Sequence, residues 1–140
     1  MTTRRQALTS AITRLREVLT EPENDVSRDA AIQRFEFCFE LAWKAIQERA
    51  QDEGMDCQSP KNCLKLAFKN SWIIDEPAWL AMLVDRNQTS HTYDETLAKA
   101  VYGRLRSHLP LLEGLANKLV ECLTLFVVYP RRPWRDDTWR

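Results

Sequence analysis

The chain has 140 residues, enough for one domain with a single buried core. Its 20 basic and 20 acidic residues balance, which excludes non-specific coating of nucleic acid through an overall basic surplus but leaves room for a local basic groove. No apolar run approaches the roughly 18 residues of a membrane span, and the first residues lack the apolar core of a signal peptide. We therefore expect a cytoplasmic protein without a membrane association.

Apolar residues at helical spacing predict a series of helices in chain order. The first covers residues 3–20. A second, central helix begins with Ser27 as its cap and runs to about residue 52, with apolar side chains on more than one side. Ser59 followed by Pro60 is a start signal for a short third helix.

A fourth helix starts at residues 75–77 and carries Trp79 among its apolar residues. The fifth begins after Asp94 and keeps its apolar spacing to residue 123. With short connectors, these segments predict an all-α, antiparallel four- to five-helix bundle over residues 1–125. Residues 126–140 lose the helical period, so we expect an irregular C-terminal tail there.

The four cysteines lack the spacing of a zinc site. Cys38 and Cys63 fall in apolar patterns and are interpreted as buried thiols, which fits a reducing cytoplasm. We expect no metal and no cofactor.

Residues 85–93, which follow the apolar part of the fourth helix, combine a cation, an amide, hydroxyls, an imidazole and a phenol. Arg86 can hold a phosphate through its planar fork of donors, and His91 can move protons near neutral pH. In an uninterrupted helix these two residues would sit roughly 140° apart. Either Arg86 reaches around the helix, or the helix breaks before His91.

This motif, Arg-Asn-x-x-x-His, is similar to the Arg-polar-x-x-x-His motif of the HEPN superfamily, and Arg86, His91 and Tyr93 together resemble the form found in HepT-type toxins. The flanking blocks at 34–44, 59–60 and 79–83 extend the likeness to the nucleotidyltransferase substrate-binding family, a HEPN branch usually encoded beside a small nucleotidyltransferase.

The resemblance implies a metal-independent endoribonuclease in a toxin-antitoxin-like pair. Arg86, His91 and Asn87 would be catalytic, and Ser90 would orient groups by hydrogen bonding. The phenol of Tyr93 would accept AMP from the partner nucleotidyltransferase, and that modification would neutralise the protein. The resemblance also implies a homodimer, a hetero-oligomer with the nucleotidyltransferase, and RNA as a ligand.

Two interpretations of the central helix remain open. Arg34 and Glu40 border the active cleft, or Glu36, Glu40 and Lys44 form a ladder of ion pairs on a solvated edge. His108 has no matching motif and is interpreted as a surface or bend-filling residue.

The sequence also leaves three kinds of function open. The alternative to a ribonuclease is a non-catalytic substrate-binding subunit that completes a separate nucleotidyltransferase. A third interpretation is a structural dimer with a vestigial motif. The chain lacks the glycine-serine motif and paired carboxylates of a nucleotidyltransferase active site, so we do not expect it to be the transferase itself.

Overall fold

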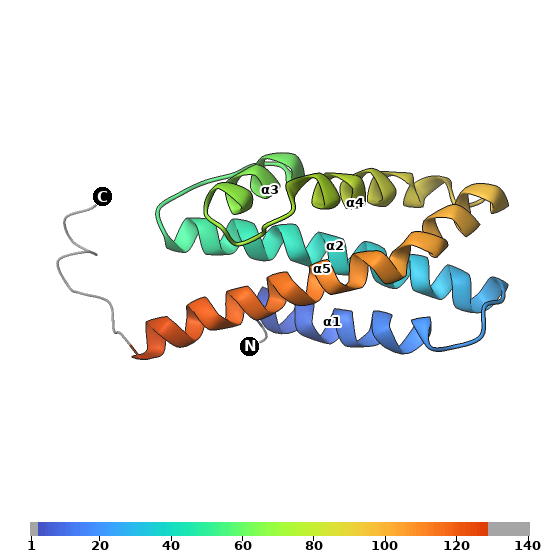
Figure 1. Cartoon of the computed structure of the whole chain (residues 1–140), viewed down its shortest axis with the longest axis horizontal. Coiled ribbons are helices and arrows are strands. Elements are labelled where there is room, and N and C mark those ends of the chain that lie inside the picture. The colour runs from blue at the N-terminus through green and yellow to red at the C-terminus, as the bar shows by residue number, and fades with distance from the viewer. Residues whose placement is uncertain (1–2, 129–140) are drawn as a thin grey trace.

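The structure, a computed structural model, describes the backbone of residues 3–128 and the side chains of residues 3–119. Its elements in chain order are α1 (Arg4–Leu19), α2 (Asp25–Asp52), α3 (Pro60–Lys69), α4 (Glu76–Gln88), the 3₁₀ turn η1 (Thr89–His91) and α5 (Glu95–Val128). Helices α1 and α4 run in one direction and α2 and α5 in the other; the short α3, which follows α2 and precedes α4 in the chain, lies near the end of α2 (Figure 1). The predicted antiparallel helical bundle is confirmed.

Side-chain caps explain where the helices begin. Ser59 caps α3 ahead of Pro60, as predicted, and the carboxylate of Asp94 accepts the first backbone N–H groups of α5. The predicted cap of α2 is wrong. Asn24 is the cap: its side-chain oxygen accepts the backbone N–H of Ser27. Ser27 is the third residue of the helix, and its hydroxyl oxygen accepts the backbone N–H of Asn24 in return.

The core lies along α2, which packs against each of the other helices. Trp79 and Trp72 are buried in it, whereas Trp43 is half-buried at its edge. Burying one such large side chain contributes about 1.5–3 kcal/mol. The largest fully buried side chains of the core are Trp79, Phe35, Phe39, Leu8, Leu15, Ile46, Leu64, Met82, Leu105, Leu112, Leu115 and Leu119.

Helix α5 continues to Val128, three residues beyond the boundary expected at residue 125. The remainder of the predicted tail, residues 129–140, lies outside the described residues. No helix within residues 3–128 is both long and apolar enough to cross a membrane.

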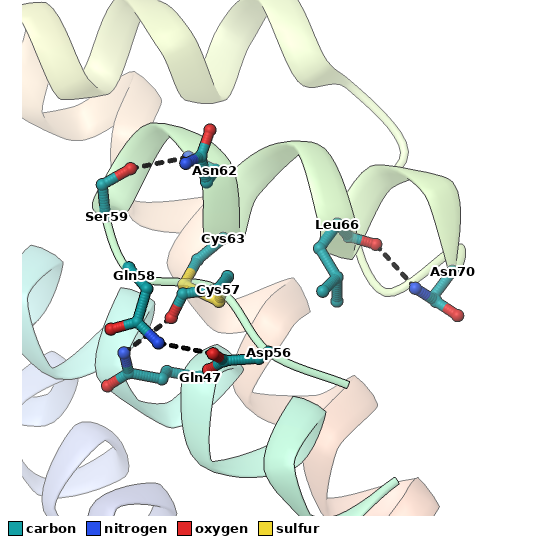
Figure 2. The surroundings of a disulfide bond; sticks show 9 residues. All are labelled: Gln47, Asp56, Cys57, Gln58, Ser59, Asn62, Cys63, Leu66 and Asn70. Atoms are coloured by element: carbon teal, nitrogen blue, oxygen red, sulfur yellow. Dashed lines mark hydrogen bonds between the residues drawn. A yellow bond between two sulfur atoms is a disulfide. The ribbon is translucent and has the colours of Figure 1, made fainter. Parts of the chain in front are cut away.

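The interpretation of Cys63 as a free thiol is wrong. Cys57, in the loop after α2, forms a disulfide with Cys63 in the first turn of α3, and their Cα atoms are 5.1 Å apart (Figure 2). The side-chain amide of Gln47 on α2 donates to the carbonyl of Cys57 at 2.7 Å. Cys38 is a free, buried thiol, as predicted.

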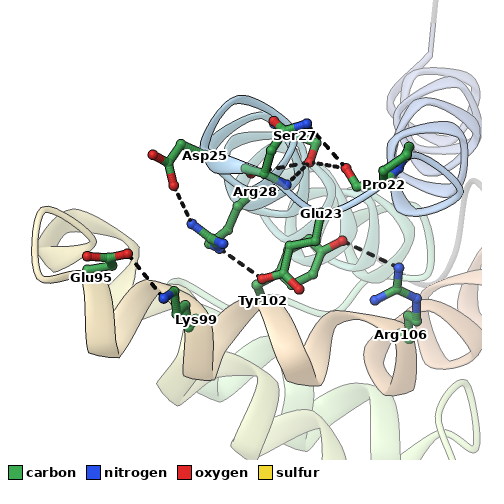
Figure 3. A network of polar contacts seen from close by, with 10 residues as sticks. Pro22, Glu23, Asp25, Ser27, Arg28, Glu95, Lys99, Tyr102 and Arg106 are labelled. Carbon is green, nitrogen blue, oxygen red and sulfur yellow. Dashed lines mark hydrogen bonds and ion pairs between the residues drawn. The ribbon is translucent and has the colours of Figure 1, made fainter.

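Polar contacts hold the turn between α1 and α2. Arg28 pairs with Glu23 at 3.0 Å and with Asp25 at 2.9 Å (Figure 3). A separate ion pair, between Lys99 and Glu95, lies near the start of α5 in the same view. The guanidinium of Arg106 on α5 donates to the carbonyl of Leu19 at 2.6 Å. This bond joins the end of α1 to α5, at the end of the bundle where η1 also lies (Figure 1).

Candidate functional site

The last turn of α4 directs two consecutive side chains to two different helices. Successive residues of an α-helix point about 100° apart, so Asp85 and Arg86 can reach separate neighbours. Asp85 meets α5 through Arg104 and His108, and Arg86 meets Glu40 on α2. The end of α4 is thereby attached on two sides.

Arg86 forms an ion pair with Glu40, and both side chains are partly exposed, at 30% and 26%. The other oxygen of the Glu40 carboxylate accepts the indole N–H of Trp43 at 2.9 Å. Arg86 also donates to the side-chain oxygen of Asn87 at 3.3 Å. The structure thus brings Glu40, Arg86 and Asn87 together, with the Arg86 side chain partly exposed.

Arg34, the other residue expected near the cleft, is placed elsewhere. Its guanidinium donates to the backbone carbonyl of Arg14 on α1 at 2.8 Å. The ladder interpretation does not describe Glu40 either, because its ion-pair partner is Arg86 on α4 rather than Lys44.

Asp85 is the buried centre of a second polar group. Arg104 donates to both of its carboxylate oxygens, at 2.8 to 3.1 Å, and Nε2 of His108 lies 2.7 Å from Oδ2. Burial by itself raises the pKa of Asp85, but hydrogen bonds and positive charge from Arg104 and His108 outweigh that effect and hold the pKa below its usual value. The bond to Asp85 in turn raises the pKa of Arg104.

His108 is not a surface residue. Its side chain is buried, and its ring stacks on Phe35 of α2 with 5.5 Å between centroids. Sequence reasoning missed this group. The available signal was Asp85 itself, a carboxylate three residues after the buried Met82 on the same helix face, together with Arg104 and His108 four residues apart on α5.

The α-helix ends at Gln88, and His91 falls in the 3₁₀ turn, so the helix does break before His91. Threonine hydroxyls hold this turn: Thr89 donates to the carbonyl of Arg86 at 2.7 Å, and Thr92 to that of Thr89 at 3.0 Å. The hydroxyl of Ser90 makes only a long contact, 3.5 Å, to the carbonyl of Asn87.

His91 and Tyr93 are both exposed, and Tyr93 has 85% of its surface open to solvent. Their rings are edge to face, with 6.0 Å between centroids. Within residues 3–119, no hydrogen bond joins Arg86 to His91. The arrangement therefore offers an accessible imidazole and phenol beyond the end of α4, and a cation already paired with a carboxylate on its α2 side.

The chain matches the family model described as nucleotidyltransferase substrate binding protein like over residues 3–121. The chain belongs to this family. A curated relative from Haemophilus influenzae, named "Probable ribonuclease HepT", is 36% identical over 84 residues, which is 56% of this chain and 58% of the relative. The match thus spans little more than half of that protein's length.

Two solved structures are similar over most of the chain. A crystal structure from Thermus thermophilus has 39% identity and a TM-score of 0.76, covering 80% of this chain and 98% of that one. A Haemophilus influenzae structure, described as the fold of a substrate binding domain of a nucleotidyltransferase, has 28% identity and a TM-score of 0.74, covering 82% and 98%. The helical fold of the family is therefore shared.

Proposed function

We propose that the protein is a metal-independent endoribonuclease that works as one half of a toxin-antitoxin-like pair with a small nucleotidyltransferase. The observation that carries the proposal is where the motif lies. Arg86 is in the last turn of α4 and forms an ion pair with Glu40, and the exposed imidazole of His91 follows in η1. Membership of the substrate-binding family supports the partner, and the name of the Haemophilus relative supports the chemistry.

In the proposed reaction, the 2′-hydroxyl of a ribose attacks the adjacent phosphorus. The 2′-oxygen loses its proton and forms a P–O bond, while the bond to the 5′-oxygen breaks and that oxygen leaves with a proton. His91 moves these protons, and Arg86 stabilises the added negative charge on the phosphate oxygens. The products are a 2′,3′-cyclic phosphate and a 5′-hydroxyl.

Arg86 changes partner in this scheme. In the free protein its charge is neutralised by Glu40, and an arriving phosphate takes over that role. Since both side chains are partly exposed, the pair is weak enough to open for a ligand. Asn87 helps to orient the guanidinium through its side-chain oxygen.

Variants at these two residues test the chemistry. His91→Ala should lower cleavage by about 10²–10⁴-fold, the usual contribution of one acid–base group, and the fold should survive because the side chain is exposed. Arg86→Ala should weaken both RNA binding and turnover. Arg16→Ala is a matched control, since it removes a partly exposed ion pair to Glu113 away from the motif. Unchanged cleavage by the His91 variant would refute the assignment.

Neutralisation through Tyr93 is the second part of the proposal. Its phenol is highly exposed and lies beside the ring of His91, so a partner enzyme can reach it and a phosphate added there would crowd the imidazole. AMP adds negative charge that repels RNA. Incubation with an active partner nucleotidyltransferase and ATP should raise the intact mass by one or more AMP units. Tyr93→Phe should keep most cleavage and escape the modification; an unchanged wild-type mass would contradict the proposal.

A homodimer is the expected assembly, with Phe37 on α2 and Val84 on α4 as exposed apolar candidates for its interface, at 53% and 55% exposure. Trp79 on α4 is part of the core and does not contribute to such an interface. Light scattering without a partner should return twice the chain mass at micromolar concentration, and a monomer mass would contradict this.

The second candidate function is a substrate-binding subunit for a separate nucleotidyltransferase, favoured by the description of the Haemophilus influenzae structure. Arg86 would then hold a phosphate for chemistry done by the partner. In that case the wild-type chain cuts no RNA, and Arg86→Ala lowers the partner's transfer rate.

A further inference from the structure

The group formed by the buried Asp85 and His108 with the partly exposed Arg104 is used neither by the proposed cleavage step nor by the proposed modification. We propose that these are positioning residues: they fix the hairpin formed by α4, η1 and α5, and so set where Arg86 and His91 stand. The catalytic part of this inference rests on the proposed function, whereas the structural part can be tested without it.

The burial of Asp85 and His108 indicates that the carboxylate needs all of its hydrogen-bond partners. Asp85 and His108 are only 4% and 6% exposed, and a carboxylate at that depth is costly unless it is fully paired. Both oxygens of Asp85 accept hydrogen bonds, three from Arg104 and one involving His108. The planar fork of Arg104 makes the pairing directional, because it fits the carboxylate in one orientation.

The position of the group in the hairpin explains what it controls. Asp85 directly precedes Arg86, so fixing the rotation of α4 at Asp85 also fixes the direction in which Arg86 leaves the helix. Arg86 then meets Glu40 on α2. Loss of the Asp85 contacts would leave the partly exposed pair of Arg86 with Glu40 as the ion pair that fixes the last turn of α4 among the described residues.

The same group closes the loop that carries His91. The segment after Arg86 is bonded to α4 through the hydroxyl of Thr89, and its other end caps α5 through Asp94, whose N–H also donates to the carbonyl of His91 at 3.1 Å. Asp85, in the last turn of α4, and Arg104, about two and a half turns into α5, join the two helices that flank this loop. The spacing between α4 and α5, and with it the shape of η1, therefore depends on the group.

The competing explanation is that the group only stabilises the fold as a whole. Amide hydrogen exchange, measured segment by segment, separates this explanation from a positioning role. Positioning predicts that Asp85→Asn increases amide exchange in residues 86–94 by about tenfold or more, the equivalent of one lost buried hydrogen bond to a charged group, while exchange in α1 stays unchanged. Faster exchange throughout the bundle would overturn the proposal. Arg104→Gln is the milder variant if Asp85→Asn fails to fold, because the Arg104 side chain is 48% exposed.

Kinetics give the second readout. At a temperature where every variant is folded, Asp85→Asn and His108→Ala should lower kcat for RNA cleavage by about 10- to 100-fold, as expected for a small misplacement of reacting groups, with KM changed less. His108→Gln, which keeps a donor toward Asp85, should recover much of the loss. Glu113→Gln, which breaks the Arg16 pair elsewhere on α5, is the matched control and should leave kcat and local exchange unaltered.

The outcomes of the two proposals are distinguishable. If the wild type cuts no RNA, the proposed ribonuclease function fails, and the exchange measurement still decides whether the group positions the hairpin. If the wild type cuts RNA and a folded Asp85→Asn protein does so at the wild-type kcat, the positioning role is overturned while the ribonuclease proposal stands.

Discussion

Reduction of the disulfide between Cys57 and Cys63 should lower the free energy of unfolding by about 2 kcal/mol. The bond closes a loop with a sequence separation of 6 residues. For a loop of that size, the chain-entropy relation gives a loss of about 7 cal/mol/K in the unfolded state, which is about 2 kcal/mol at 25 °C. In a chain of this length each kcal/mol moves the melting temperature by about 3–4 °C, so the expected change in Tm is about 6–8 °C.

The assay compares thermal unfolding of the same wild-type protein with and without a thiol reductant, and intact mass establishes the state of the bond. Cys57→Ala is the control, because it cannot form the bond and its Tm should not respond to reductant. Equal Tm values for the oxidised and reduced wild type would refute the reasoning. That result would mean that Gln47 and the Ser59 cap already order the loop without the bond.

Three further predictions concern single residues. The pKa of Asp85 is lowered in the folded protein, so its contribution to stability is complete above the unfolded pKa of about 3.9 and is lost as pH falls below it. The difference in unfolding free energy between wild type and Asp85→Asn should therefore shrink as pH falls below about 4; a difference that grows below pH 4 would contradict the assigned direction. Burial raises the pKa of Cys38 to about 12, so a thiol alkylating reagent should modify it only as fast as the protein unfolds, and rapid labelling of the native protein would count against its burial. Ser59→Ala should cost about 1 kcal/mol in chemical denaturation through loss of the α3 cap, and no measurable change would show that Pro60 alone starts the helix.

Much of the fold could be predicted from the sequence because its signals are local. Apolar spacing identified the helices, and the Ser59-Pro60 and Asp94 signals located two of the starts. The start of α2 was misplaced because Asn24 and Ser27 are both good caps, and the choice between them depends on the path of the preceding turn.

The pairing of side chains across helices could not be predicted in the same way. Nothing local distinguishes Glu40 from Glu36, yet the ion pair with Arg86 forms at Glu40. His108 was interpreted as a surface or bend-filling residue because its partners, Asp85 and Phe35, are far away in the chain. The same limit applies to Cys57 and Cys63, whose spacing does not by itself indicate a bond.

The measurement that tests the central claim most directly is the chemistry of the RNA ends left by the purified protein in the presence of excess chelator. Attack by the 2′-hydroxyl, with protons moved by His91, predicts a 2′,3′-cyclic phosphate on one fragment and a 5′-hydroxyl on the other. A single 2′-deoxy substitution at the cleaved position should block the reaction. Fragments that end in a 3′-hydroxyl and a 5′-phosphate, or cleavage that survives the 2′-deoxy substitution, would contradict the account.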